Sequence, residues 1–189
     1  MTPLRLVVFG RQGAGKGTQC LLLSEHYGVP HISTGDMLRE AAAAGTSFGL
    51  KAKTYMDRGE LLPDDIMLGV IEERLAATDV VDHGFLLDGF PRTKGQAEAL
   101  LALLGGGDGL DLAVNIEVPE EIVLERIAGR ARDDDTSHAV TARLEAYALY
   151  TMAALAIFDS KGLLVNVDGV GTPDEVFARL REAIDAARA

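Results

Sequence analysis

The chain has 189 residues, of which 48% are apolar, which is enough to bury the core of one compact α/β domain and is unlike a disordered sequence. Its formal net charge of −11 disfavours nucleic acid and anionic membranes as partners, and it requires any site for an anionic substrate to concentrate its cations locally. No apolar run is long enough to span a bilayer and no basic leader precedes the first run, so we expect a cytoplasmic protein.

Short apolar runs rich in β-branched residues alternate along the chain with longer segments typical of helices. In chain order we predict a strand at 4–9, a helix at about 15–26, a strand at 29–33, helices at 34–44, 47–58 and 63–77, a strand at 85–87, a helix at about 93–104, a strand at 112–118, a helix at 119–130, a long helix ending near 161, a strand at 163–167 and a final helix from 172. Thr172 and Glu175 have the spacing of a capping box at the start of that last helix. This alternation predicts a central parallel sheet of five strands, covered by helices on both faces.

The only cysteine, Cys20, lies on the first predicted helix. A single cysteine excludes an intrachain disulfide and a cysteine-based zinc site, and we interpret Cys20 as a small buried apolar residue. The glycine-rich segment 105–109 is interpreted as a flexible loop and not as a domain linker, because a predicted strand follows it at once.

A second glycine-rich segment, 10–18, separates the first predicted strand from the first helix. Its glycines let the backbone curl so that several N–H groups point at one anion, and the start of the helix adds its dipole. Lys16 supplies a cation for the β- and γ-phosphates of a nucleotide, and Thr18 offers a hydroxyl towards Mg²⁺. The strict P-loop pattern has Ser or Thr directly after the lysine, whereas Gly17 intervenes here. The alternative is a chance glycine-rich turn, which the strand–loop–helix context disfavours.

The sequence Gly-Lys-Gly-Thr-Gln at 15–19 resembles the adenylate kinase family, and so do the later segments 33–39, 87–93 and 126–147. The resemblance covers nearly the whole chain, in order. It implies a P-loop kinase fold in a single domain (1–189) with a small helical NMP-binding subdomain at 33–62 and a very short lid at 129–135. It also implies the reaction ATP + AMP ⇌ 2 ADP with Mg²⁺, in a monomer whose partners are ATP and AMP or ADP and which holds no structural zinc.

The resemblance also assigns roles to individual residues. The catalytic cations are Lys16, Arg92, Arg126, Arg130, Arg132 and Arg143. The residues implied to bind ATP are Gly13, Ala14, Gly15, Lys16, Gly17, Thr18, Arg130 and Gly171. Those implied to bind AMP are Thr34, Arg39, Glu60, Leu61, Leu62, Gly89, Phe90, Pro91, Arg92, Gln96, Arg132 and Arg143. Thr18 and Asp88 are implied to hold Mg²⁺, Asp88 through water; the alternative for Asp88 is a residue that caps a turn.

Residue chemistry supports these assignments. Arginine suits the neutralisation of spreading negative charge, because its planar fork binds phosphate through two hydrogen bonds and stays charged. Arg126 and Arg130 lie four residues apart on one helix face, where they repel each other unless an anion lies between them. Gln96 offers a donor and an acceptor side by side, which matches the edge of adenine. Pro91 resembles a position that is often cis in the family.

Two alternatives and three departures qualify the resemblance. A uridylate/cytidylate kinase is disfavoured by Thr34, where those relatives usually have alanine, and by Thr93. A regulatory module without turnover is disfavoured because Lys16, Asp88 and the arginines are all present.

The family's usual proline in the phosphate loop is replaced by Gln12, and Ala154 and Phe158 replace a proline and a tyrosine of the long helix. The lid is minimal, with Ala131 alone between its two arginines, which puts the placement of Arg132 in question.

Overall fold

The computed structural model describes residues 3–107, 109–129 and 135–188. Within them, five parallel strands form one sheet in the order β2-β3-β1-β4-β5. These strands are β1 (Leu4–Gly10), β2 (His31–Ser33), β3 (Gly84–Asp88), β4 (Leu112–Glu117) and β5 (Leu164–Asp168). The α/β fold with an all-parallel central sheet, predicted from the alternation of strands and helices, is confirmed.

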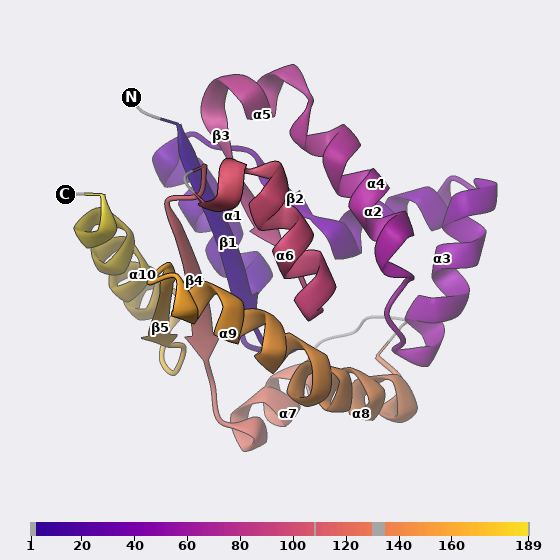
Figure 1. The fold of residues 1–189 in the computed structure, drawn as a ribbon. Coiled ribbons are helices and arrows are strands. Elements are labelled where there is room, and N and C mark those ends of the chain that lie inside the picture. Colours follow the sequence, from indigo (N-terminus) through magenta and orange to yellow (C-terminus); the bar gives the residue numbers. More distant parts are fainter. Residues whose placement is uncertain (1–2, 108, 130–134, 189) are drawn as a thin grey trace.

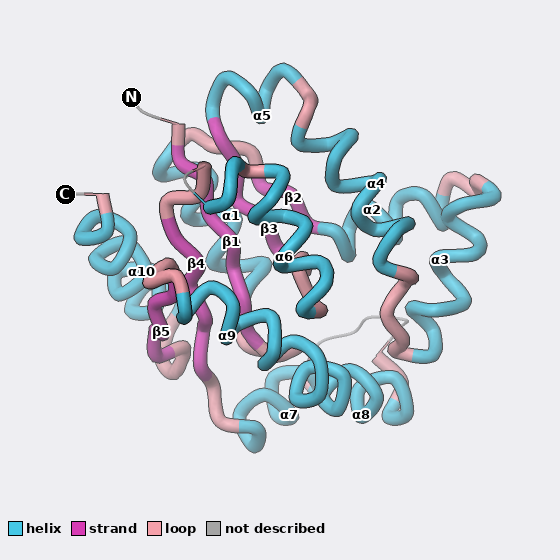
Figure 2. Tube along the Cα trace, viewed as in Figure 1, coloured by secondary structure: helices cyan, strands magenta, loops and turns pink. Residues whose placement is uncertain are grey.

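Helices surround this sheet on both faces and extend beyond one edge of it (Figures 1 and 2). They are α1 (Lys16–Tyr27), α2 (Thr34–Ala43), α3 (Ser47–Arg58), α4 (Asp64–Leu75), α5 (Thr78–His83), α6 (Lys94–Leu103), α7 (Glu120–Ala128), α8 (Ser137–Ala146), α9 (Met152–Ser160) and α10 (Pro173–Ala187). In Figure 1, α2 and α3 lie side by side at the right, away from the sheet. No helix in the described part of the chain is both long and apolar enough to cross a membrane.

The alternating side chains of the strands divide the core into two layers. On β1, Val7 and Phe9 belong to the cluster that packs against α4, α6 and α9. Leu6 and Val8, on the opposite face, belong to the cluster that packs against α1, α7 and α10. Both faces of the sheet are therefore buried, as expected for parallel strands that are connected by helices.

Three predicted elements differ from the structure. The predicted helix 63–77 is wrong in its extent: α4 ends at Leu75, Ala77 is extended, and α5 begins at Thr78 so that Val80 can bury against the core. The predicted long helix is interrupted by a π-helical turn at Tyr147–Thr151, a feature that often marks functional positions. The segment predicted as a flexible loop contains a 3₁₀ turn at Gly105–Gly107.

Several local predictions are confirmed. Thr172 and Glu175 form the capping box of α10, in which each side chain accepts a hydrogen bond from the other residue's backbone N–H. Cys20 is fully buried. Ala154 and Phe158 are also fully buried and belong to the core, consistent with their interpretation as structural replacements.

Candidate active site

A cavity of about 380 Å³ opens at the carboxyl edge of the sheet, where β1, β2 and β3 end. Gly10 ends β1 at this cavity, Thr34 follows β2, and Asp88 ends β3 with Gly89 directly after it. Parallel strands end at one edge of a sheet, and α/β proteins bind ligands there. Segments that are far apart in the sequence are thereby brought to one place.

The phosphate loop forms one wall of this cavity. Its backbone takes positive φ at Gly13 (84°) and Gly15 (94°), which only glycine adopts without strain. A Cβ atom on Gly13 would also lie 2.9 Å from the carbonyl oxygen of Val123, so larger residues are excluded there. Gly15 is the N-cap of α1 and provides no side chain to cap it, and the first residues of α1 line the cavity, where a helix N-terminus favours an anion.

Lys16, the first residue of α1, folds back over this loop. Its ammonium donates hydrogen bonds to the carbonyl oxygens of Gly10 (2.8 Å) and Arg11 (3.1 Å). The side chain lines the cavity, as do Gly17 and Thr18. The loop, the helix dipole and the ammonium therefore bring positive potential to a single point, which suits a chain of phosphates.

Asp88 ends β3 at the floor of the cavity and is only 8% exposed. Its carboxylate lies 3.5 Å from Nε2 of His31. Burial alone would raise the pKa of Asp88, but the contact with His31 and the positive charges of Lys16, His31 and Arg92 outweigh it and hold the pKa below its ordinary value. The carboxylate is consequently ionised at neutral pH.

Guanidinium groups converge in the same cavity. Arg92 donates from Nε to the carbonyl oxygen of Gly89 (2.6 Å). Burial lowers the pKa of Arg92, Asp88 opposes this shift, and the neighbouring charges of Arg143 and Arg39 lower it further. Three like charges that act on one another in a partly dry cavity form a strong site for an anion such as phosphate.

Carboxylates accompany two of these arginines. Arg39 pairs with Asp36 one helical turn away. Arg143 pairs with Asp135 (3.2 Å) and donates to the carbonyl oxygen of Met56 (2.9 Å). Asp135 also accepts a hydrogen bond from Nε2 of Gln12 (2.6 Å), so the residue that replaces the family's proline links the phosphate loop to Arg143.

The Gln96 amide, predicted to contact adenine, lies at the cavity wall and is 2% exposed. Its oxygen accepts a hydrogen bond from the backbone N–H of Arg92 (2.7 Å), and its nitrogen donates to Oδ1 of Asp64 (2.7 Å). Oδ2 of Asp64 in turn accepts from the hydroxyl of Thr93 (2.8 Å). Gln96 therefore positions the backbone at Arg92 as well as lining the cavity.

Most of the predicted site residues line this one cavity: Gly13, Gly15, Lys16, Gly17, Thr18, Thr34, Arg39, Glu60, Leu61, Leu62, Asp88, Gly89, Phe90, Pro91, Arg92, Gln96 and Arg143. The peptide bond between Phe90 and Pro91 is cis. Thr34 is buried, and its hydroxyl donates to the carbonyl oxygen of Asp88. Arg130 and Arg132, with most of the predicted lid, lie outside the described residues.

Three other predicted residues lie outside the cavity lining. Arg126 donates to the carbonyl oxygens of Ala14 (3.3 Å) and Gly169 (3.1 Å), so it ties the phosphate loop to the loop after β5. Ala14 is buried against the neighbouring core. Gly171 lies in the loop after β5 with φ of 131°, next to the side chains of Glu175 and Arg179.

Sequence reasoning missed several residues that shape the site. Thr151 donates to the carbonyl oxygen of Arg92 (3.1 Å), and Tyr147 donates to Oδ1 of Asn115 (3.0 Å). Both line the cavity on the face that carries Arg143. Their positions, four and eight residues after Arg143, are a helical spacing that could have identified them. The role of Asp64 has no such signal, because its partners are distant in sequence.

A phosphate loop on a five-stranded parallel sheet, with a cluster of arginines in the same cavity, defines a P-loop nucleotide kinase. A family model described as "Adenylate kinase" matches residues 8–163. A protein from Xanthomonas oryzae pv. oryzae named "Adenylate kinase" is 48% identical over 186 residues, which cover 96% of this chain and 99% of the relative. Proteins of the same name from Xanthomonas campestris pv. campestris and Xylella fastidiosa are 47% and 48% identical over the same shares of each chain. The chain belongs to the adenylate kinase family.

Proposed function

We propose that this protein transfers the γ-phosphoryl group of MgATP reversibly to AMP, giving two molecules of ADP. One observation carries the proposal: the phosphate loop and the cluster of Arg39, Arg92 and Arg143 line the same cavity. A donor triphosphate on the loop and an acceptor monophosphate on the arginines would meet between them. Such an arrangement supplies positioning and charge neutralisation, which are what phosphoryl transfer requires of a protein.

Each group has a defined task in this mechanism. The loop N–H groups and Lys16 bind the β- and γ-phosphates. They also stabilise the negative charge that spreads over the equatorial oxygens during transfer. Arg92 and Arg39 orient the phosphate of AMP, and Arg143 stabilises the charge between the two nucleotides. No side chain has to act as a base, because the attacking oxygen of AMP is already ionised. Lys16 would exchange the carbonyl oxygens of Gly10 and Arg11 for phosphate oxygens.

The residues present also fit a magnesium ion. The Asp88 carboxylate is ionised and borders the cavity, and the hydroxyl of Thr18 lies on the same wall. Mg²⁺ keeps most of its waters and needs few protein ligands, so Asp88 would hold it through water and Thr18 directly. The ion supplies charge neutralisation between the β- and γ-phosphates when it is bound. His31 keeps the carboxylate of Asp88 in place.

AMP is the expected acceptor because of Thr34 and Gln96, which line the acceptor side of the cavity. A coupled assay of ADP formation against AMP, CMP, UMP and GMP tests this choice. We expect the highest kcat/KM with AMP. A higher value with UMP or CMP would favour the uridylate/cytidylate kinase alternative instead.

Closure over the nucleotides is assigned to residues 33–62 and 129–135, which we propose to move as an NMP-binding subdomain and a short lid. Arg130 and Arg132 would then reach the phosphates, while Arg126 supports the phosphate loop from behind. A structure with a bisubstrate analogue tests the lid. If Arg132 points to solvent in that structure and Arg132→Ala keeps full kcat, its assignment is wrong.

We also infer that the protein acts as a monomer in the cytoplasm. One chain supplies both the phosphate loop and the acceptor arginines of the cavity, which supports a monomeric enzyme. Sedimentation or light scattering at assay concentrations tests the monomer. Activity that rises more steeply than protein concentration would contradict it.

A further inference from the structure

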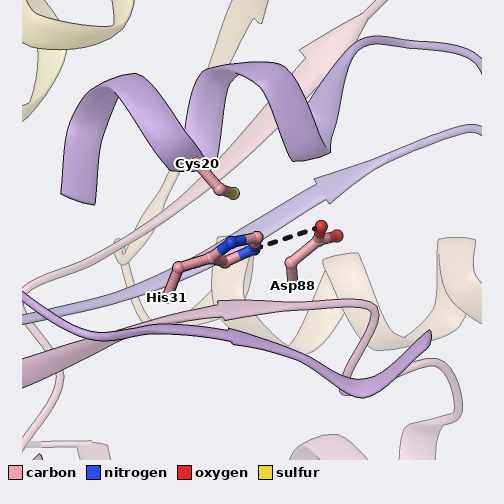
Figure 3. A group of neighbouring side chains, drawn as sticks. All are labelled: Cys20, His31 and Asp88. Atoms are coloured by element: carbon pink, nitrogen blue, oxygen red, sulfur yellow. Dashed lines mark ion pairs between the residues drawn. The ribbon is translucent and has the colours of Figure 1, made fainter. Parts of the chain in front are cut away.

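Three side chains that can bind metals meet beneath the helix that follows the phosphate loop. Cys20 on α1, His31 on β2 and Asp88 at the end of β3 each offer one ligand atom, and these atoms all lie within 4.8 Å of one another. Figure 3 shows Cys20 pointing from the helix toward the sheet, where the His31 ring and the Asp88 carboxylate face each other. The cluster contains Asp88 but extends away from the cavity to His31, which holds the Asp88 carboxylate, and to Cys20, which the proposed reaction does not use.

The backbone explains why the three side chains converge. In the parallel pairing of β2 with β3, His31 is opposite Leu86, and Asp88 lies two residues further along the same strand. A period of two places His31, Leu86 and Asp88 on one face of the sheet, and that face packs against α1. Cys20 lies four residues after Lys16 and so shares a helix face with it. The ligand atoms are consequently held by two strands and a helix, not by loops.

The cluster is buried and its hydrogen bonding is incomplete. Cys20 is fully buried and Asp88 is 8% exposed. Nε2 of His31 is buried without a hydrogen-bond partner in the described structure, since its contact with Oδ2 of Asp88 is an ion pair at 3.5 Å. Buried polar atoms normally have partners, and those that do not call for an explanation such as an ion.

We propose that Cys20, His31 and Asp88 form a binding site for one thiophilic divalent transition-metal ion, for which zinc is the best match, and that occupation of this site inhibits phosphoryl transfer. Sulfur, imidazole nitrogen and carboxylate oxygen are the ligands zinc prefers, whereas Mg²⁺ selects oxygen. The Cys20 thiol loses its proton to solvent as the sulfur–metal bond forms. Thiolate and carboxylate then balance the charge of the ion, and water fills the fourth position.

The sequence-based exclusion of a cysteine-based zinc site overlooked this mixed set of ligands, in which one cysteine suffices. The proposed ion is not structural, since the elements that carry its ligands belong to the central sheet and its packed helix. It can enter from the floor of the cavity, because Asp88, Lys16 and Gly17 all line that cavity.

Inhibition follows from competition for one carboxylate. An ion bound between Cys20 and His31 takes the Asp88 carboxylate that MgATP requires, and it also places positive charge next to Lys16. This consequence rests on the proposed function, whereas binding of the ion does not. The two parts therefore need separate measurements.

Binding is tested on the metal-free protein by titration with Co²⁺ in the absence of nucleotide. Cys20 is the only cysteine, so a thiolate-to-cobalt charge-transfer band can arise from this site alone. We expect such a band, its loss on addition of Zn²⁺, and its absence in Cys20→Ala. Zinc affinity, measured by competition with a chromogenic chelator, should fall about tenfold or more in Cys20→Ala and His31→Gln, because each removes one ligand.

His83→Gln is the matched control, since His83 is an exposed histidine on α5 away from the cluster. Its zinc affinity should equal that of the unmodified protein. Absence of the charge-transfer band, or equal zinc affinity in all variants, overturns the site. If Cys20→Ala and His31→Gln fail to fold by circular dichroism, X-ray absorption of the zinc-loaded native protein decides: one sulfur neighbour supports the site, and none overturns it.

Inhibition is then measured with excess Mg²⁺ at fixed ATP and AMP. The zinc concentration for half-inhibition should be the same in the native protein and His83→Gln, and about tenfold or more higher in Cys20→Ala, in line with its lower affinity. An unchanged value in Cys20→Ala overturns the inhibitory role. If the native protein shows the cobalt band but no transfer from ATP to AMP, the proposed function fails and the metal site stands.

Discussion

Replacement of Asp64 by alanine tests the hydrogen-bond chain that supports the acceptor side of the cavity. Asp64 lies in the first turn of α4 and accepts hydrogen bonds from Gln96 and Thr93, both at the start of α6. Gln96 passes this restraint to the backbone N–H of Arg92. The substitution removes both bonds and leaves the buried amide nitrogen of Gln96 without its carboxylate.

The size of the effect follows from the kinds of bonds lost. A hydrogen bond to a charged group contributes about 1.5–3 kcal/mol, and Asp64 accepts two of them in a partly exposed position. We therefore expect Asp64→Ala to lower the free energy of unfolding by about 2–4 kcal/mol. Release of Gln96 should also loosen Arg92, so the KM for AMP should rise more than the KM for ATP.

Asp65→Ala is the matched control because Asp65 lies in the same first turn of α4 but is exposed. Both substitutions remove a negative charge from the start of the helix, so the macrodipole contribution cancels in the comparison. Urea unfolding of the two variants, with initial rates at varied AMP, gives the required quantities. Unfolding free energies that agree within about 0.5 kcal/mol, the scatter of ordinary surface substitutions, would refute this account of the chain.

Three further predictions concern the phosphate loop, the acceptor side and the π-helical turn. Lys16→Ala should lower kcat by about 10²–10³ with little change in Tm, because the ammonium acts mainly on phosphate; near-full activity would contradict the assignment of the loop. Gln96→Ala should reduce the preference for AMP over other monophosphates in kcat/KM, and an unchanged preference would exclude Gln96 from base selection. Burial raises the pKa of Tyr147 from 10.0 to about 12, an effect that Arg11 opposes and Glu117 reinforces. The folded state favours the neutral phenol of Tyr147, so this group's contribution to the free energy of unfolding is kept below pH 10.0 and lost as the pH rises towards 12. Tyr147→Phe removes this titrating group, so it should lose less stability over this pH range than the exposed control Tyr150→Phe, which keeps it.

The sheet could be predicted from the sequence because its signals are local. The run from Leu4 to Gly10 is apolar on both faces, and the pairings of β1 with β3 and β4 bury both of them. The capping box at Thr172 is equally local, since its hydrogen bonds join residues three apart. The break between α4 and α5 was missed because no glycine or proline marks it; it depends on the burial of Val80 in the core.

The site was predictable as a set of residues but not as a network of contacts. Family motifs indicated that Gln96 belongs to the site, and the structure places it in the lining of the cavity. Its bonds to Asp64 and to Arg92 depend on how α4 packs against α6, and no spacing in the sequence encodes that packing. Cys20 likewise meets His31 only because β2 pairs with β3 beneath α1.

Although the chain as a whole is acidic, its cavity is lined by cations, and local acceptor groups hold these cations in place. Arg39 and Arg143 each pair with a carboxylate, Asp36 and Asp135 respectively, and Lys16 contacts backbone carbonyl oxygens. These partners hold the cations in place, so little reorganisation is needed when phosphate replaces the partners. Charge that is already oriented lowers the barrier to phosphoryl transfer. Arg92 differs, since burial and a backbone carbonyl contact hold it, and the charges of Arg143 and Arg39 lower its pKa. The strongest demand for an anion therefore lies at Arg92, the residue that we propose orients the acceptor phosphate.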